Sequence, residues 1–340
     1  MTVTTIEQLE ELLSRPSVAD IEAMKELDGD LIILGVGGKM GPSLAIRARR
    51  AAEAAGVERR IIGVSRFTNP DVREQLEESG VETLAADLLE QEELARLPDA
   101  PNVIFMAARK FGTTEAEHLT WAMNTYLPGR VAERCYASRI VAFSSGNVYP
   151  LVPVSRGGAT EHTPPCPLGE YAMSVLGRER MFEHMSERYG TPITLLRLNY
   201  AVELRYGVLF DIGRKVFERR PINLSMGSAN VIWMGDANSV CLRSFELCSS
   251  PPAVLNLTGP ETISVRQVAR RFGELLNIEP IFEGVESETA LLSNAGRCHR
   301  LFGYPAVTVD EIVDWVAKWI AMGGPTLEKP THFEVRNGAF

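Results

Sequence analysis

A glycine-rich turn between a buried strand and a helix constrains this chain more than any other feature of its sequence. Gly35, Gly38 and Gly41 form the pattern G-x-x-G-x-x-G, with an apolar run at residues 31–34 before it and a segment of helical period at residues 42–50 after it. Glycines permit a tight turn and a close approach of a ligand to the backbone. The N-terminus of the following helix offers N–H groups and a positive dipole end to an anion. The pattern therefore predicts a site for a pyrophosphate.

Strands and helices are expected to alternate after this turn. Apolar strands are predicted at residues 60–64, 81–85, 102–106, 140–143 and 193–198, and segments of helical period separate them. Such alternation requires right-handed crossovers and a parallel sheet that is covered on both faces. The sequence therefore predicts an α/β fold: a doubly wound parallel sheet, the Rossmann fold, with a smaller C-terminal substrate-binding lobe.

Changes in pattern divide the chain into predicted parts. The first helix is expected to open with the capping box Thr5-x-x-Gln8, and the region near the C-terminus has little periodicity, so it is either a docked strap or disordered. The parts are an N-terminal helical extension (1–27), a Rossmann dinucleotide-binding domain (28–200, with 231–260 returning to it), a substrate-binding lobe (201–230 and 261–325) and a tail (326–340).

Composition excludes several classes of partner. With a net charge of -9 the chain lacks the basic surface that nucleic acid requires, so no nucleic-acid partner is expected. No apolar run approaches the roughly 20 residues that span a bilayer, so we expect no membrane association and a cytoplasmic location. The five cysteines are dispersed and odd in number, which predicts reduced thiols, and the five histidines lack metal-binding spacing, so no metal site is predicted.

The residues after the second and third strands bear on the cofactor. Ser65 and Arg66 stand where a site selective for NAD would place an acidic side chain on the ribose 2′-hydroxyl, and they suit a 2′-phosphate instead. Lys39 could add a second positive charge. NADP is therefore favoured and NAD possible, with solvated surface charges as the alternative for both cations. Asp87 is expected to accept a hydrogen bond from the adenine amino group while Leu88 packs on the ring, or else to cap a helix.

Later segments carry a resemblance to a known family. Residues 103–108 resemble its fourth-strand motif, Asn124 follows in the next helix, residues 143–149 resemble its serine motif, and Tyr171 falls in a tyrosine motif at the expected distance. Over roughly residues 28–320 the chain resembles the extended short-chain dehydrogenase/reductase family of NAD(P)-dependent sugar epimerases, dehydratases and reductases.

The resemblance implies a set of functional residues. Ser145 and Tyr171 would be catalytic, and a homodimer would form through the helices near Asn124 and Tyr171. The residues expected to bind the cofactor are Gly35, Gly38, Lys39, Met40, Gly41, Ser65, Arg66, Asp87, Leu88, Ala107, Ala108, Asn124 and Tyr171. The residues expected to bind the substrate are Ser145, Asn147, Asn199, Tyr200 and Arg205, with packing of the lobe as the alternative for the last three.

The chain departs from the family at one position. The tyrosine motif should read Y-x-x-x-K, but the fourth residue after Tyr171 is Val175, and valine cannot lower the pKa of a phenol as a nearby cation does. Three explanations are open. Another cation substitutes, with Lys110 better placed for catalysis than Arg178, which could be a surface residue. Alternatively, Tyr171 stays neutral and acts as an acid, or redox chemistry has been lost.

Two hypotheses about function follow. The first is an NAD(P)-dependent oxidoreductase or epimerase that acts on a hydroxyl or keto group of a sugar or sugar-acid-like molecule, with Ser145 and Tyr171 at the reacting oxygen. The second is a catalytically degenerate nucleotide sensor on the same fold, which the substitution at Val175 motivates. Retention of both Ser145 and Tyr171 favours the enzyme, although a packed aromatic on a buried helix face is the alternative for Tyr171.

Overall fold

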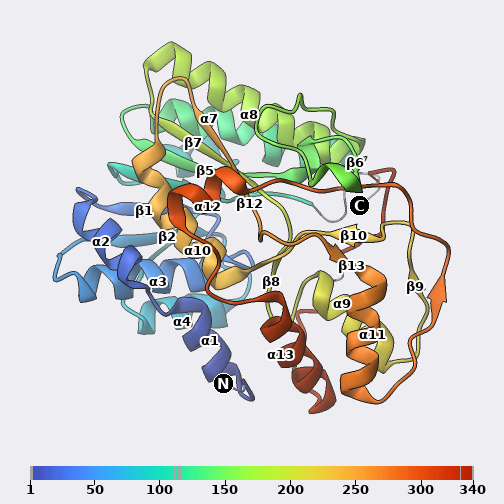
Figure 1. Cartoon of the computed structure of the whole chain (residues 1–340). Coiled ribbons are helices and arrows are strands. Elements are labelled where there is room, and N and C mark those ends of the chain that lie inside the picture. Colours follow the sequence, from blue (N-terminus) through green and yellow to red (C-terminus); the bar gives the residue numbers. More distant parts are fainter. Residues whose placement is uncertain (1–2, 111, 113–115, 330, 339–340) are drawn as a thin grey trace.

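A seven-stranded parallel sheet forms the centre of the molecule (Figure 1). The computed structural model describes residues 3–110, 112, 116–329 and 331–338. The strands lie in the order β12-β7-β5-β4-β1-β2-β3. Their bounds are β1 Leu31–Leu34, β2 Ile61–Ser65, β3 Glu82–Ala85, β4 Asn102–Phe105, β5 Arg139–Ser145, β7 Ile193–Leu198 and β12 Ala253–Leu257. The predicted doubly wound α/β fold is confirmed, and each of the six predicted strands is present within two residues of its expected bounds.

The side chains of β1 show how this sheet is covered on both faces. Leu31 and Ile33 belong to one hydrophobic core cluster, whereas Ile32 and Leu34 belong to a second. Successive side chains of a strand point to opposite faces, so a strand in which every residue is buried must have a helical layer on each side.

The two helical layers come from different parts of the chain (Figure 1). One layer holds α1 Ile6–Ser14, α2 Val18–Glu26, α3 Gly41–Ala54, α4 Pro70–Glu78 and α10 Met234–Arg243. The other holds α5 Gln91–Ala95, α6 Glu117–Trp121, the π-helix η1 Ala122–Tyr126, α7 Leu127–Arg134 and α8 Gly169–Tyr189. The short helices η2 Gly146–Val148, η3 Val154–Arg156 and η4 Ser244–Leu247 lie in connecting segments, and α12 Gly296–Phe302 packs against β12.

A smaller lobe is built around three helices that pack on one another, α9 Val208–Phe217, α11 Val265–Leu276 and α13 Val309–Ala321. Two-residue strands pair around it and along its junction with the main sheet. They are β6 Val152–Pro153 with β15 Thr289–Ala290, β8 Ala201–Val202 with β11 Ile232–Trp233, β9 Ile222–Asn223 with β14 Phe282–Glu283, and β10 Ser228–Ala229 with β13 Ile263–Ser264. We retain the division into domains given above as a proposal.

The two N-terminal helices pack against α3 and α10. The Thr5 hydroxyl accepts the N–H of Gln8 at 3.2 Å, as expected of the cap. The reciprocal bond of the predicted capping box differs from the prediction. The Gln8 side chain accepts from the backbone N–H of Thr4 at 2.8 Å, one residue before the expected donor Thr5. The buried Asp20 carboxylate binds Arg47 of α3 at 2.6 Å and accepts the hydroxyl of Ser239 from α10 at 2.5 Å.

The described part of the tail is a docked strap, which settles the alternative left open by the sequence. Phe333 is buried in the main core cluster. Glu334 pairs with Lys215 of α9 at 2.9 Å, and Arg336 donates to the carbonyl oxygen of Thr289 at 2.7 Å. These contacts attach the strap to α9 and β15, and Gly338 lies against Gly169 at the start of α8. None of the helices in the described part of the chain is long and apolar enough to cross a membrane.

Candidate active site

The glycine turn has the geometry that a pyrophosphate site requires. Gly35 has a φ of +92°, and a Cβ there would lie 2.5 Å from the backbone nitrogen of Ala107. A Cβ at Gly41 would overlap the carbonyl oxygen of Val36, so this glycine allows α3 to pack on the turn. At Gly38 the nearest atom to a Cβ is 3.5 Å away. Met40 is the N-cap residue of α3 but makes no side-chain hydrogen bond to the helix. The cap side chain therefore does not bond the backbone N–H groups at the start of α3.

A cavity of about 540 Å³ opens beside this turn, at the carboxyl ends of β1, β4, β5 and β7. Ligands of open α/β sheets bind at this edge, near the point where the strand order reverses. The predicted site residues that line the cavity are Gly38, Lys39, Met40, Ala108, Lys110, Ser145, Asn147, Tyr171, Asn199 and Tyr200.

Ser145 and Tyr171 meet in this cavity. Ser145 ends β5, and Tyr171 lies in the first turn of α8. Burial raises the pKa of Tyr171 above its ordinary value of 10, while the charge of Arg178 and a side-chain hydrogen bond with Ser145 act in the opposite direction. The phenol is therefore protonated at neutral pH and can donate a proton.

Arg178 is buried, so the alternative that it is only a surface residue is excluded. It stands two turns after Tyr171 on the same face of α8, and its side chain lines the cavity. The guanidinium donates to the carbonyl oxygens of Phe143 at 2.6 Å and Ala107 at 3.1 Å, and to the Asn124 side chain at 3.0 Å. Burial lowers its pKa to about 10, which leaves it charged at neutral pH. Val175 packs instead in an apolar cluster.

Asn124 occupies the centre of the π-helix η1, and its side chain is fully buried. Its amide oxygen accepts the backbone N–H of Arg109 at 2.9 Å, and its amide nitrogen donates to the Arg109 carbonyl at 2.9 Å and to the Ser174 hydroxyl at 3.0 Å. Asn124 therefore holds the segment after β4 against α8. π-helical turns inside α-helices are frequent at functional sites.

Lys39 and Lys110 also point into the site. The Lys39 amine lies 3.3 Å from the centre of the Tyr206 ring. The Lys110 amine lies 5.9 Å from the centre of the Tyr171 ring and donates to the Thr331 carbonyl at 3.3 Å. Burial lowers the pKa of Lys39 to about 7 and that of Lys110 to about 8.

The residues expected to contact substrate divide into two groups. Asn199 is buried, and its side-chain nitrogen has no hydrogen-bond partner in the described structure, so it offers a donor to a ligand. Tyr200 has a φ of +48°, a conformation uncommon for a bulky residue. Arg205 does not join them, because it forms ion pairs with Glu203 at 3.1 Å and Glu10 at 2.8 Å and lines a neighbouring pocket.

The residues assigned to the adenosine half of the cofactor lie after β2 and β3. Ser65 ends β2, and the exposed Arg66 lies 3.7 Å from the Asp87 carboxylate. Asp87 accepts the backbone N–H of Leu89 at 3.0 Å and is not the cap of α5, which begins after Glu90. Leu88 is buried in the second core cluster. Ala107 is likewise buried and lies against Gly35.

One part of the site was missed by the sequence reasoning. It is the tail, because Lys329 and Thr331 line the cavity and Thr331 donates through its backbone N–H to Asp211 of α9 at 2.8 Å. The tail has no periodicity from which docking could be inferred. Arg178 was named above as a candidate replacement cation, and its spacing of seven residues from Tyr171 indicates the same face of one helix.

A buried network of charged and polar side chains connects β5, which carries Ser145, to α8 and β7. The Ser144 hydroxyl donates to Glu179 of α8 at 2.5 Å, and Arg197 of β7 binds Glu179 at 2.7 Å and donates to the Tyr149 hydroxyl at 2.8 Å. Because a buried ion pair with every partner satisfied is costly to rearrange, this network fixes β5 relative to α8. Among the described residues, no group of three or more His, Cys, Asp or Glu side chains is arranged to hold a metal ion.

Comparison with known proteins identifies the family. The model of the NAD dependent epimerase/dehydratase family matches residues 31–202, about half of the chain, and this protein belongs to that family. No functionally curated protein matches its sequence. The resemblance to extended short-chain dehydrogenases/reductases is thereby confirmed.

Solved structures show the same fold at low sequence identity. The UDP-glucose 4-epimerase of Thermotoga maritima is 16% identical, with a TM-score of 0.71 over 86% of this chain and 99% of that one. The corresponding values for the UDP-glucuronic acid 4-epimerase of Bacillus cereus are 15%, 0.71, 86% and 99%. For the UDP-glucose 4-epimerase of Thermus thermophilus they are 18%, 0.69, 85% and 98%.

Proposed function

We propose that this protein is an NAD(P)-dependent oxidoreductase or epimerase that acts on a hydroxyl or keto group of a sugar or sugar-acid-like molecule. The observation that carries the proposal is the Ser145–Tyr171 pair, which faces the same cavity as the glycine turn. Family membership and the UDP-sugar epimerases among the similar structures support this reaction class.

The residues present fit a nicotinamide dinucleotide. The space beside Gly38 and the uncapped start of α3 suit its pyrophosphate, and Ala108 lines the cavity towards Tyr171. When bound, the nicotinamide would accept or supply a hydride. Hydrogen bonds from Ser145 and from the side-chain nitrogen of Asn199 would orient the substrate oxygen. Tyr171 would donate its proton to that oxygen during reduction and take it back during oxidation.

Two cations are candidates for the role of the missing lysine. Arg178 is charged and electrostatically coupled to Tyr171, but its donors bind carbonyl oxygens of the surrounding strands and helix. Its role is therefore positioning. Lys110, whose amine lies 5.9 Å from the Tyr171 ring centre, is the catalytic cation that we propose. Its lowered pKa of about 8 keeps it largely protonated at neutral pH.

NADP stays the favoured cofactor of this proposal, with NAD as the alternative. The guanidinium of Arg66 is exposed and follows β2, where a 2′-phosphate would lie. The Bacillus cereus and Thermus thermophilus structures contain NAD. Exchange of Arg66 for Asp should weaken binding of NADPH far more than binding of NADH, measured by fluorescence titration. Unchanged affinities for both would remove Arg66 from the cofactor site.

The reaction itself is tested by stopped-flow absorbance of bound cofactor across a panel of sugars, sugar acids and nucleotide sugars. Tyr171→Phe should slow hydride transfer about 100-fold or more, because general acid–base catalysis contributes at least that factor. Tyr189→Phe, at the other end of α8, serves as the matched control and should react like the wild type. Equal, near-zero rates in the wild type and Tyr171→Phe would instead support the nucleotide sensor.

A homodimer through α6, η1 and α8 is part of the proposal. Leu119, Tyr126 and Met173 are exposed large hydrophobic residues on these helices, and an exposed apolar surface of this kind suits a protein–protein contact. Light scattering of Tyr126→Glu should report a monomer where the wild type is a dimer. A wild-type monomer at micromolar concentration would contradict this assembly.

A further inference from the structure

The polar groups of Thr331 are all hydrogen-bonded where the tail reaches the cavity. Its backbone N–H and its hydroxyl donate to the same oxygen of Asp211, Oδ2, at 2.8 and 2.5 Å. Its carbonyl oxygen accepts the Lys110 amine at 3.3 Å. Thr331 is 1% exposed and lines the cavity. This residue therefore links α9 of the lobe to the segment after β4.

Lys110 is held at both ends of its side chain. Asn124 of η1 binds the backbone N–H and the carbonyl oxygen of Arg109, the residue before Lys110, at 2.9 Å each. The amine at the far end meets the Thr331 carbonyl. Because a flexible four-carbon stem separates the backbone of a lysine from its amine, fixing the backbone alone would leave the ammonium many positions. The contact with Thr331 favours those beside Tyr171, whose ring centre lies 5.9 Å from the amine.

The tail itself is fixed by contacts that follow Thr331. Phe333 is 1% exposed and belongs to the main core cluster. Arg336 donates to the carbonyl oxygens of Ser225 at 2.9 Å and Thr289 at 2.7 Å. A buried aromatic side chain and a bound guanidinium prevent the segment from sliding, because any shift would expose the ring and break the hydrogen bonds. The Thr331 carbonyl is therefore a fixed acceptor.

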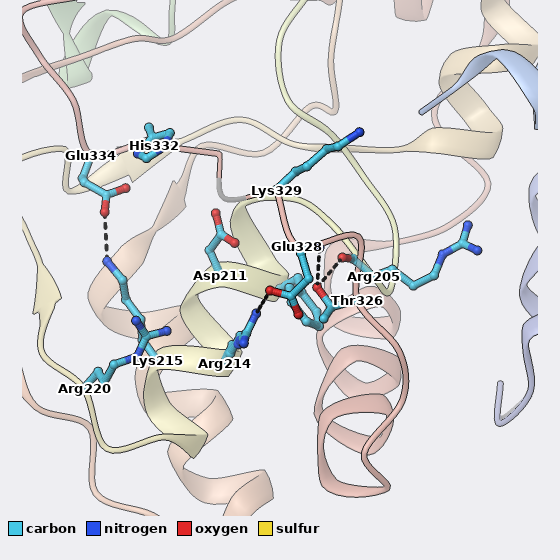
Figure 2. A pocket seen from close by; sticks show the side chains of 11 residues that line it. Arg205, Asp211, Arg214, Lys215, Arg220, Thr326, Glu328, Lys329, His332 and Glu334 are labelled. Carbon is cyan, nitrogen blue, oxygen red and sulfur yellow. Dashed lines mark hydrogen bonds and ion pairs between the residues drawn. The ribbon is translucent and has the colours of Figure 1, made fainter. Parts of the chain in front are cut away.

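Asp211 is the residue of α9 that holds Thr331. Beside it, the adjoining pocket of about 250 Å³ contains two ion pairs between α9 and the tail, Lys215 with Glu334 at 2.9 Å and Arg214 with Glu328 at 3.6 Å. In Figure 2 the Asp211 carboxylate points from α9 towards the tail, between these pairs. Burial raises the pKa of Asp211, and the hydrogen bonds from Thr331 act in the opposite direction.

The charge of Asp211 also acts on the amine that Thr331 contacts. Burial lowers the pKa of Lys110 to about 8, and the negative charge of Asp211 opposes this decrease. A nearby opposite charge favours the charged form of a titrating group. Asp211 therefore favours the ammonium form of Lys110 through its charge, and the position of that ammonium through Thr331.

We propose that Thr331 and Asp211 are positioning residues for Lys110: Asp211 fixes Thr331, and the Thr331 carbonyl holds the Lys110 ammonium beside Tyr171. This inference rests on the proposed function, in which Lys110 is the catalytic cation, and deepens it by making the tail part of the active site. In the motif Y-x-x-x-K the phenol and the lysine share one helix face, so the backbone sets their distance. Lys110 comes from a different segment, so a second contact has to set that distance.

Acetylation of the lysine amines with acetic anhydride, measured over a range of pH, tests the contact without requiring turnover. The reagent reacts with the unprotonated amine, and mass spectrometry of peptides follows each lysine separately. Lys25, which is exposed on α2, is the internal reference. Titrating groups that act on the Lys110 amine or on the Asp211 carboxylate, or that these two act on, are Lys39 of the glycine turn, Tyr206, Tyr171 of α8, Lys215 of α9 and Glu334 of the tail.

Three exchanges at the contact and one control are compared with the wild type. Thr331→Val keeps the shape of the side chain and the backbone bond to Asp211 but loses the hydroxyl bond. Acetylation of Lys110 at pH 7 should therefore rise about tenfold, and Thr331→Ser should restore the wild-type rate. Asp211→Asn should move the midpoint of Lys110 acetylation down from near pH 8 by about one pH unit. The control Thr326→Val removes another tail hydroxyl, which bonds the Arg205 carbonyl at 3.4 Å, and should behave like the wild type.

The outcomes separate this inference from the proposed function. Changes at Lys110 that are confined to Thr331→Val and Asp211→Asn, with constant labelling of Lys25, support the positioning role. Wild-type labelling of Lys110 in both variants overturns it, and so does an equal change in Thr326→Val, which would reflect general loosening of the tail. Because labelling requires no turnover, neither result alters the test of Tyr171→Phe, which measures hydride transfer.

Discussion

Replacement of Arg178 by methionine tests how the active site is held together. The guanidinium donates to the carbonyl oxygens of Phe143 at the end of β5, Ala107 after β4 and Asn124 in η1. β5 and the segment after β4 line the cavity that Tyr171 faces, and η1 packs against α8, which carries Tyr171. Methionine keeps much of the side-chain volume but supplies no donor, so the variant removes the bonds and the charge together.

Two opposing contributions determine how much the free energy of unfolding changes in Arg178→Met. Arg178 is 2% exposed, and lowering its pKa to about 10 from the ordinary arginine value corresponds to about 3 kcal/mol, which the variant recovers. Four charge-assisted hydrogen bonds of about 2 kcal/mol each are lost, three to carbonyl oxygens and one to the Asn124 side chain, or about 8 kcal/mol together. The free energy of unfolding should therefore fall by about 5 kcal/mol, which corresponds to a decrease in Tm of about 7 °C for a chain of this length.

Urea unfolding and calorimetry measure this change. The matched control is Arg180→Met on the same helix, which removes only an exposed ion pair with Glu183 and should cost less than about 0.5 kcal/mol. Arg178→Met should also weaken dinucleotide binding, because the ends of β4 and β5 lose a common anchor. If Arg178→Met is as stable as Arg180→Met and binds dinucleotide equally well, the positioning role is refuted.

Three further predictions concern the glycine turn and the titrating groups. Gly38→Ala should preserve the free energy of unfolding within about 0.5 kcal/mol and abolish dinucleotide binding. Gly41→Ala should instead destabilise the fold, because its Cβ overlaps Val36. Urea unfolding and fluorescence titration of the dinucleotide distinguish the two variants. The pKa of Lys39 is about 7 in the folded protein and about 10.5 when unfolded, so the unfolded chain binds more protons. Lys39 should therefore contribute a rise of about 2 kcal/mol in the free energy of unfolding between pH 7 and 9, in addition to the rise from Lys110, whose pKa is lowered to about 8. A rise in Lys39→Met equal to that of the wild type would contradict this. Because burial raises the pKa of Tyr171, kcat for ketone reduction should fall only where Lys110 loses its proton, with a midpoint near pH 8, and should stay constant between about pH 6 and 9 in Lys110→Gln. A decline in that variant with a midpoint near pH 7 would show that the tyrosine ionises earlier.

The sequence predicted the parts of this molecule that obey local periodicity. The strand before Gly35, the helix after Gly41 and the strands that follow are read from apolar spacing, and the structure contains them. The environment of Arg178 was not predictable in that way, because helical period assigns a face without revealing which neighbours cover it. The tail was unpredictable for a different reason: its order comes from tertiary contacts such as that of Glu334 with Lys215.

The position of β12 at one edge of the main sheet limits how this chain can be shortened. β12 pairs with β7, but α9 and α10 lie between them in the sequence. A fragment that ends after β7 would leave the backbone N–H and C=O groups along one side of that strand exposed. Unpaired strand edges promote association between copies and aggregation. A truncated nucleotide-binding half should therefore aggregate and be unsuitable for crystallography or ligand screening, even though it retains the glycine turn.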